Sequence, residues 1–324
     1  MPAEVSLFYK GKLAFVAGGT GLIGSHVVEE LLKAGARVRT VVHIRPNPFP
    51  GKVEEVRGDL RIPKDCDRAV QGSDFVFQCA GVSGGMGRVG RDPIPMFTDP
   101  LILSAQILEA ARRNGVKRFA FASNASVYPD GPGPMPEEAA WGSNIGKVEN
   151  YAGLAKRVAE MQCVLYAGRT DMKVAIVRGG AAYGPRDYFD PENSHVIPSL
   201  VRRAVERQRP FRLWGDGTPL RDFTYVRDIA RGLLFALEHY AVCEPLNIAT
   251  GRAVSIGEAA KVALDAAGYR DAEIVYEGSR SGTPVKLLDV SKMRRLGFTP
   301  SVTLEHGLRE AVAWYRAHAQ VKAG

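Results

Sequence analysis

A glycine-rich turn between an apolar run and an amphipathic stretch constrains the fold of this chain more than any other feature. Residues Gly18-Gly19-Thr20-Gly21-Leu22-Ile23-Gly24 follow the apolar run Leu13–Ala17 and open a helical pattern from Ser25 to Ala34. Residues without a Cβ let backbone N–H groups at a helix start come close to a pyrophosphate, which the positive end of the helix dipole also attracts. A tight turn without a ligand is the alternative. The strand before, the helix after and a second apolar run, Val38–Val42, favour a βα unit that binds a nicotinamide dinucleotide.

From this turn to about residue 180, short β-rich runs alternate with helical patterns. The expected strands are Leu13–Ala17, Val38–Val42, Val53–Arg57, Phe75–Cys79, Arg118–Ala122 and Lys173–Arg178. The expected helices are Ser25–Ala34, Leu101–Asn114 and Leu154–Ala167. This alternation predicts an α/β fold with a doubly wound parallel sheet of the Rossmann type. Ligands of such sheets bind beyond the carboxyl ends of the strands, so the loops expected to form the site are Ala80–Arg91, Ser123–Pro129 and Gly179–Asp190.

After residue 180 the pattern is less regular. Helices are expected at 196–208, 226–239, 255–267 and 304–317, with short strands at 211–213, 246–248 and 274–276. We therefore expect two domains. Residues 1–180 would form the dinucleotide-binding Rossmann domain, and residues 181–324 would mainly form a smaller C-terminal substrate lobe.

Composition narrows the class of protein. The 324 residues carry a formal net charge of +8, but the basic residues are scattered except for one cluster between Arg202 and Arg209. A diphosphate-bearing small molecule accounts for this cluster at least as well as nucleic acid does. The four cysteines show no C-x-x-C pair and no metal-ligand spacing, and no apolar run approaches the length of a membrane span. We expect a cytoplasmic protein with reduced thiols, no metal, no membrane association and no nucleic-acid partner.

The end of the second expected strand favours NADP(H) over NAD(H). An Asp or Glu at this place binds the ribose hydroxyls of NAD, but here the strand ends Val41-Val42-His43-Ile44-Arg45. Cationic Arg45, together with His43 when it is protonated, suits a 2′-phosphate, and solvated loop residues are the alternative. Asp59 is a candidate for the adenine amino group, or else an ordinary turn residue. The expected cofactor contacts are Gly18, Thr20, Gly21, Leu22, Ile23, Gly24, His43, Arg45, Asp59, Leu60 and Ala80.

Several motifs together resemble the extended short-chain dehydrogenase/reductases that act on nucleotide sugars. They are the glycine turn, Gly58-Asp59-Leu60, Ser123 to Tyr128, Lys156 and Tyr183-Gly184-Pro185-Arg186. Residues 190–198, 213–223 and 282–290 further resemble segments of the GDP-L-fucose synthases, and the likeness covers nearly the whole chain. The resemblance implies an enzyme that epimerises and then reduces a GDP-4-keto-6-deoxy sugar with NADPH.

The resemblance also implies roles for residues at matching positions. His195 would be a general acid in epimerisation, because a pKa near neutrality suits proton delivery to an enediolate carbon. Lys156 would hold the nicotinamide ribose and lower the pKa of a catalytic tyrosine. The implied contacts to the nucleotide-diphospho-sugar are Arg203, Trp214, Arg221 and Lys286. The alternatives are a histidine at a helix start, a surface lysine, solvated arginines and a core tryptophan.

One departure from the family concerns the catalytic tyrosine. The family pattern is Tyr-x-x-x-Lys, but Ala152 stands four residues before Lys156, and Tyr151 stands five before it. On a regular helix the first spacing separates two side chains by about 40° and the second by about 140°. Tyr151 therefore shares a face with Lys156 only if the helix start is distorted, for example by a π-turn.

Other departures fall in the expected substrate pocket. Asn124 replaces the catalytic Ser or Thr of the family, and an amide cannot relay a proton as a hydroxyl does. Ser126 replaces the cysteine that serves as the epimerisation base in fucose synthases, and a serine is a poor base without an activating partner. Ala125 and Ser126 also take the place of the acidic pair of dehydratases, and Ala181 stands where relatives often have an Asn.

Three readings remain open at this point. The first is an epimerase and/or reductase on a GDP-4-keto-6-deoxy sugar, with Tyr151, Lys156, His195, Ser126 and Asn124 as the catalytic residues. The second is an epimerase without net redox chemistry, which needs His195 and some base. The third is a protein that binds NADP and a sugar nucleotide without turnover. A homodimer through the helices near 101–114 and 154–167 is also expected, and whether the loop 81–91 closes over the substrate is left open.

Overall fold

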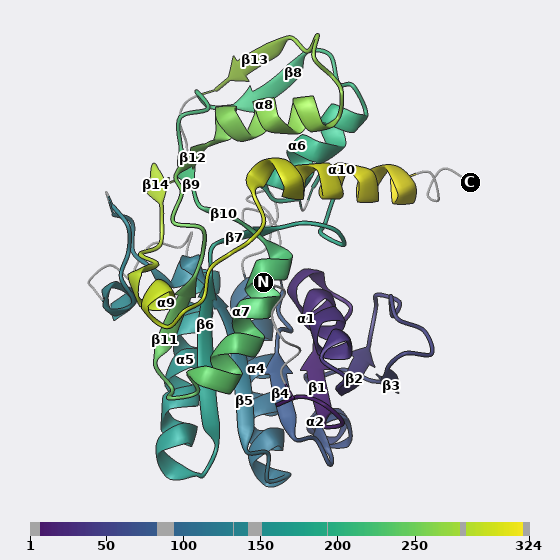
Figure 1. Ribbon diagram of the computed structural model, residues 1–324, viewed down its shortest axis with the longest axis vertical. Coiled ribbons are helices and arrows are strands. Elements are labelled where there is room, and N and C mark those ends of the chain that lie inside the picture. Colours follow the sequence, from purple (N-terminus) through teal and green to yellow (C-terminus); the bar gives the residue numbers. More distant parts are fainter. Residues whose placement is uncertain are drawn as a thin grey trace.

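A seven-stranded parallel sheet forms the centre of the larger lobe, in the order β3-β2-β1-β4-β5-β6-β11 (Figure 1). The computed structural model describes residues 7–82, 94–131, 133–141, 151–192, 194–278 and 283–319. The strands are β1 (Leu13–Ala17), β2 (Arg37–Val42), β3 (Glu54–Arg57), β4 (Phe75–Gln78), β5 (Arg118–Asn124), β6 (Lys173–Gly179) and β11 (Pro245–Ile248). The strand order reverses between β1 and β4, so the predicted doubly wound Rossmann sheet is confirmed.

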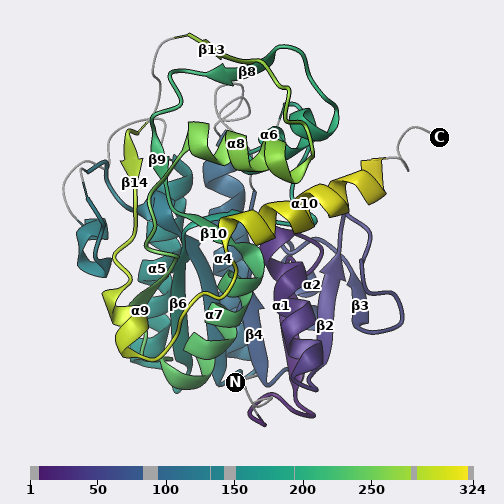
Figure 2. The same ribbon diagram turned by 45° about the horizontal axis from the view of Figure 1, so that its top comes forward.

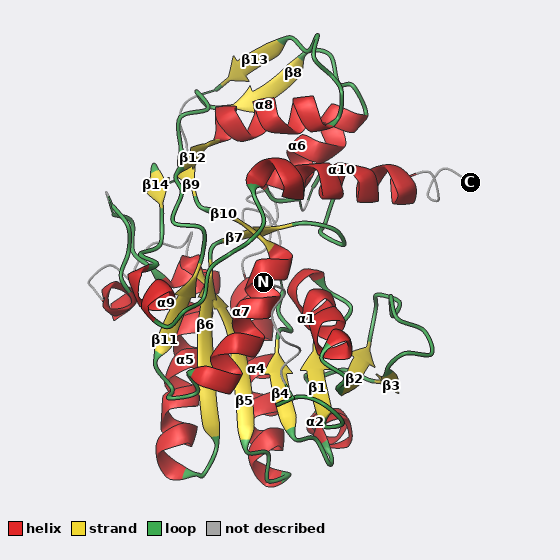
Figure 3. Ribbon diagram, in the orientation of Figure 1, coloured by secondary structure: helices red, strands yellow, loops and turns green. Residues whose placement is uncertain are grey.

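Helices cover both faces of this sheet. On one face lie α1 (Leu22–Lys33) and α7 (Val226–His239), and on the other lie α2 (Pro63–Val70), α4 (Ile94–Arg113) and α5 (Tyr151–Arg169). Because both faces are covered, the central strands are rich in apolar residues, and all five residues of β1 are buried. The carboxyl ends of the strands point toward the smaller lobe (Figure 3).

The smaller lobe has its own apolar core between three helices and short strands. The helices are α6 (Val196–Val205), α8 (Ile256–Ala266) and α10 (Leu304–Ala319), which pack on one another (Figure 2). The strand pairs are β8 (Phe211–Trp214) with β13 (Ile274–Glu277), and β7 (Ala181–Tyr183) with β10 (Phe223–Tyr225). A further small sheet joins β12 (Val254–Ser255), β9 (Leu220–Arg221) and β14 (Val285–Lys286). The remaining short helices are η1 (Ala125–Val127), η2 (Glu137–Trp141) and α9 (Ser291–Arg295).

The chain returns to the larger lobe after residue 180. Helix α7 packs against β5 and β6, and β11 extends the sheet beside β6, with Leu246 and Ile248 fully buried. Most of the 181–324 segment nevertheless lies in the smaller lobe, and the expected division at residue 180 stays a prediction.

The differences between expected and observed elements have local causes. Helix α4 begins at Ile94 and not at Leu101, and it contains Pro100, which lacks an N–H and is more often found at a helix start. Helix α2 was not expected because its apolar surface is confined to Cys66, Ala69 and Val70. The strands β7, β9, β10, β12 and β14 have two or three residues each, too few for a periodic pattern.

Candidate active site

The glycine turn after β1 has the geometry that a pyrophosphate site requires. Gly18 has a φ of +74°, and a Cβ there would lie 2.8 Å from the Ala80 backbone, while a Cβ on Gly24 would lie 2.1 Å from the Gly18 carbonyl oxygen. Gly21 is the N-cap of α1 and provides no side-chain cap. The first N–H groups of α1, those of Leu22 and Ile23, therefore face the turn without a side-chain acceptor, which fits a dinucleotide phosphate.

Cationic side chains lie beyond the ends of β2 and β3. The Arg61 guanidinium donates to Asp59 at 2.7 Å and holds the pKa of that carboxyl below its usual range, and His43 Nε2 lies 3.8 Å from Asp59 Oδ2. The Arg45 guanidinium carbon lies 3.6 Å from the ring centroid of Tyr188. Leu60 is buried beneath this surface. Asp59 is the one carboxylate among the expected cofactor contacts, and Arg61 neutralises its charge. This neutralisation favours an anionic group such as a 2′-phosphate over a bare ribose.

Lys156 lies at the carboxyl end of β5. Its Nζ donates to the Ala122 carbonyl oxygen at 2.7 Å and lies 4.8 Å from the centroid of the Phe121 ring. Burial lowers the pKa of this ammonium to about 8, although the neighbouring Cys79 and Glu160 side chains oppose the shift. The alternative of a surface helix lysine is therefore wrong, and the ammonium faces the end of the sheet where the nicotinamide is expected.

Tyr151 is not brought onto the face of Lys156. Helix α5 is regular from Tyr151 onward, without the distortion that the Tyr151 hypothesis needs. The Tyr151 ring packs edge-on against Phe97 of α4, with centroids 6.0 Å apart, while Lys156 points to β5. The residues before Tyr151, 142–150, lie outside the described part of the chain. A catalytic role for Tyr151 stays a prediction that this geometry does not favour.

Asn124 and Ser126 bond to each other in the turn that follows β5. Asn124 is the N-cap of η1, and its Oδ1 accepts from the backbone N–H of Ser126 at 3.0 Å and from the Ser126 hydroxyl at 2.5 Å. Because a backbone N–H can only donate, the amide oxygen must face the turn, and the Nδ2 group is presented as a donor. The Ser126 hydroxyl donates its hydrogen bond to an amide oxygen, and an amide oxygen is too weak a base to activate a serine.

A buried polar network holds this turn against the sheet. Glu160 of α5 accepts from the Ser123 hydroxyl at 2.6 Å and from the Arg178 guanidinium at 2.6 Å. The Tyr128 hydroxyl donates to Asn247 of β11 at 2.5 Å. Ser123 and Tyr128 therefore stabilise the fold. The side chains of the turn that are available to contact a substrate are those of Asn124 and Ser126.

His195 lies at the start of α6, as its N-cap. The residue is exposed, and partial desolvation by the neighbouring protein lowers the pKa of the imidazole. The segment that leads to it begins at β7, so His195 belongs to the smaller lobe, and its catalytic role stays a prediction. Asn193, in the most specific part of the family resemblance, lies outside the described residues.

Arg221 and Lys286 form a pair of neighbouring cations. They stand in register on the parallel strands β9 and β14, and burial lowers the pKa of each side chain. Asp130, which accepts from the Thr283 hydroxyl at 2.6 Å, offsets part of this charge. Lys286 also lines a crevice together with Ala125 of the η1 turn. Two partly desolvated cations beside the Asn124–Ser126 turn are suited to bind a diphosphate.

Arg203 and Trp214 lie farther along the smaller lobe, on α6 and β8. The Arg203 guanidinium donates to the Ser199 and Arg212 carbonyl oxygens and lies 5.0 Å from the Phe211 ring centroid. Trp214 is 84% exposed, so the alternative of a core tryptophan is wrong. Their contacts to a nucleotide stay predictions.

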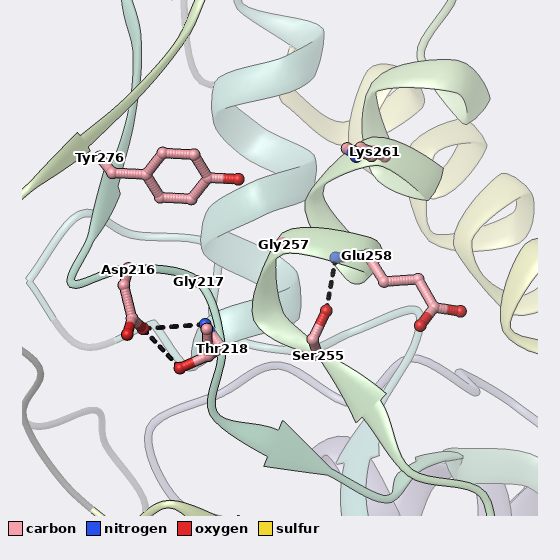
Figure 4. Close-up of a pocket in the computed structure, with 8 residues that line it drawn as sticks. All are labelled: Asp216, Gly217, Thr218, Ser255, Gly257, Glu258, Lys261 and Tyr276. Atoms are coloured by element: carbon pink, nitrogen blue, oxygen red, sulfur yellow. Dashed lines mark hydrogen bonds between the residues drawn. The ribbon is translucent and has the colours of Figure 1, made fainter.

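A separate depression of about 430 Å³ opens on the smaller lobe (Figure 4). Its walls are the β8–β9 turn, the start of α8 and the ring of Tyr276 on β13. The N-cap Ser255 accepts from the Glu258 N–H at 3.0 Å, and Asp216 accepts from the Thr218 hydroxyl at 2.7 Å. None of the expected site residues lines it.

Reasoning from the sequence missed three residues at the site: Arg61, Asp130 and Tyr188. Arg61 bonds to Asp59, which stands two residues before it, and this spacing was a usable signal. Asp130 and Tyr188 meet expected residues that are distant in the chain. Tyr188 lay in an expected loop, but no spacing connected it to Arg45. Among the described residues, no group of three metal-ligating side chains comes together, and no helix has the length and apolarity needed to cross a membrane.

Comparisons with known proteins show to which family the chain is similar. The profile of the NAD dependent epimerase/dehydratase family matches residues 14–257. The chain is 31% identical over 307 residues to the GDP-L-fucose synthase of Sinorhizobium fredii, covering 93% of this chain and 94% of the relative. It is 30% identical over 317 residues to the probable GDP-L-fucose synthase 1 of Oryza sativa, covering 94% and 92%. A solved GDP-L-fucose synthetase from Naegleria fowleri, bound to NADP, has a TM-score of 0.82 and 25% identity, covering 95% of this chain and 94% of that one. The protein therefore belongs to the NAD-dependent epimerase/dehydratase family.

Proposed function

We propose that this protein is an NADP(H)-dependent enzyme that epimerises a GDP-4-keto-6-deoxyhexose, reduces it, or does both. The observation that carries the proposal is the cation pair of Arg221 and Lys286, which adjoins the Asn124–Ser126 turn at the sheet end where Lys156 lies. The full-length similarity to GDP-L-fucose synthases supports the nucleotide and the sugar class.

The chain's own residues account for cofactor binding. The uncapped start of α1 binds the pyrophosphate, Arg45 binds the 2′-phosphate, and Lys156 binds the nicotinamide ribose hydroxyls. NADPH, when bound, supplies a hydride. Burial lowers the pKa of Lys156 because it disfavours the charged form, and this makes the ammonium a stronger hydrogen-bond donor to those hydroxyls.

Substrate binding and proton transfer use the other residues. Arg221 and Lys286 bind the diphosphate, and partial burial strengthens their attraction for it. The Asn124 amide donates to the keto oxygen and polarises the carbonyl, so that the adjacent carbons are more readily deprotonated. His195 delivers the proton in epimerisation, and its lowered pKa makes the imidazolium a stronger acid.

A second candidate is epimerisation without net reduction. It is favoured by the contact of the Tyr151 ring with Phe97, which leaves the reductive proton donor unassigned among the described residues. Enolisation beside an existing ketone needs only proton transfers.

One experiment tests both candidates. Purified protein is mixed with NADPH and a GDP-4-keto-6-deoxy sugar in deuterated water, and nicotinamide absorbance and then sugar mass are followed. Loss of NADPH absorbance is expected for a reductase. Deuterium in the sugar with NADPH unchanged supports the second candidate. If neither change occurs, catalysis on this sugar is overturned and a binding protein is supported.

We also propose a homodimer in the cytoplasm. Helix α5 carries exposed apolar side chains (Met161, Val164 and Leu165), and the adjoining α4 carries exposed Ile102. An apolar stripe across two neighbouring helices suits pairing with a second copy about a two-fold axis. The four cysteines are free thiols, which suits a reducing compartment.

A further inference from the structure

Arg45 is held from across the molecule by the loop that follows β7. Its guanidinium carbon lies 3.6 Å above the Tyr188 ring centroid, and its Nη1 donates to the Arg186 carbonyl oxygen at 3.3 Å. Both Arg45 and Tyr188 are half-buried. A stacked guanidinium uses its face for the ring, so the N–H groups on its edge stay in a defined plane.

The loop that carries Tyr188 is itself anchored. Arg186 has a φ of 67°, in the left-handed region, and its side chain donates to Ser25 and Glu29 of α1, at 2.8 Å in each case. Asp187 is buried and accepts from the Tyr188 N–H at 2.7 Å. Tyr188 is thereby fixed relative to α1, the helix whose start faces the expected pyrophosphate, and to the end of β2.

We propose that Tyr188 is a positioning residue that orients Arg45 toward the 2′-phosphate and sets the preference of this protein for NADP(H) over NAD(H). The inference rests on the proposed function, in which Arg45 contacts the 2′-phosphate. An arginine on a loop loses much side-chain freedom when it binds an anion. The stack and the hydrogen bond to the Arg186 carbonyl oxygen already restrict this side chain before the anion binds. Less conformational entropy is therefore lost on binding, and the affinity is higher.

The competing explanation is that the stack only ties the two segments together. A structural tie affects all ligands of the Rossmann domain alike. An oriented Arg45 affects only ligands with a 2′-phosphate, so the ratio of two affinities separates the explanations.

The test is calorimetric titration of the full-length protein with 2′,5′-ADP and with 5′-AMP. Wild type, Tyr188→Ala, Tyr188→Phe and Arg45→Ala are compared. We expect Tyr188→Ala to weaken 2′,5′-ADP binding by about three- to tenfold and to leave 5′-AMP binding unchanged, which also shows that the domain is folded. Tyr188→Phe keeps the ring face and retains wild-type affinity, whereas Arg45→Ala binds the two ligands equally.

Failures of the two proposals are distinguishable. If wild type binds 2′,5′-ADP no more tightly than 5′-AMP, the result contradicts both the role of Arg45 and the NADP(H) assignment. If Arg45→Ala loses the preference but Tyr188→Ala keeps it, the cofactor assignment stands and the role of Tyr188 is overturned. Equal weakening of both ligands in Tyr188→Ala also overturns it, in favour of a structural tie.

Discussion

Asp187 shows how one buried carboxyl imposes a pH dependence on the whole fold. Its Oδ2 has no hydrogen-bond partner among the described residues, and burial raises the pKa of the side chain to about 7, although the Tyr188 N–H and Arg45 oppose the shift. In the unfolded chain the pKa of an aspartate is about 3.9. Between these values the unfolded state ionises while the folded state stays protonated. Stability from this group is therefore full below about pH 4, falls as the pH rises toward 7, and is constant above that.

Asp187→Asn removes this ionisation and is expected to stabilise the protein more at pH 8 than at pH 5. An upper bound on the gain is about 4 kcal/mol, from about 1.4 kcal/mol per pKa unit. Thermal unfolding at several pH values measures it. Asp171→Asn, at a side chain that is 90% exposed, is the matched control and should show no such trend. A gain that is equal at both pH values would contradict a raised pKa at Asp187.

At the scale of elements, the direction of side chains from α5 decides which residue can assist Lys156. The helix is regular, so position 152 lies about 40° from Lys156 around the axis and position 151 about 140° away. The structure brings Lys156 to β5 and Tyr151 to α4. The spacing in the sequence and the packing in the structure agree that Tyr151 is displaced from the family position.

Ala152→Tyr is expected to increase the rate of NADPH oxidation with the 4-keto sugar by about tenfold or more, because a phenol on the face of Lys156 can donate a proton. Tyr151→Phe is the matched variant and should retain most of its activity, since the Tyr151 ring packs on Phe97. Stopped-flow absorbance gives both rates. Loss of reduction in Tyr151→Phe would mean that the start of α5 rearranges when ligands bind and that Tyr151 is the acid after all.

At the scale of the whole molecule, the uncovered apolar stripe on α4 and α5 predicts the assembly. Met161 is 55% and Leu165 59% exposed, a large apolar exposure for one helix face that faces away from the sheet. Leu165→Glu places a charge at the centre of the proposed dimer contact. We expect light scattering after gel filtration to show a dimer for wild type and a monomer for Leu165→Glu, with circular dichroism unchanged.

Val242→Glu is the control for that change, because Val242 is also 59% exposed but lies between α7 and β11. It should remain a dimer. A monomeric wild type would contradict the assembly, and a Leu165→Glu dimer would place the interface elsewhere.

Interactions between neighbouring residues were enough to predict the local parts of this protein. The spacing of apolar residues and glycines specified β1, the turn at Gly18–Gly24 and most of α1, which begins at Leu22 and not at Ser25. Backbone conformation and burial periodicity are properties of neighbouring residues. The alternation of strands and helices specified the doubly wound sheet for the same reason. The absence of an acid at the end of β2 favoured NADP(H), and the named motifs indicated the family.

The contacts between distant residues became known from the folded structure. It placed Tyr188 on Arg45, Lys286 beside Arg221, and β11 beside β6. It also turned Tyr151 toward Phe97 and the Asn124 amide oxygen toward Ser126, leaving the amide N–H groups as donors. These contacts depend on strand order, register and side-chain direction, which arise when segments far apart in the chain pack together and which no local spacing encodes.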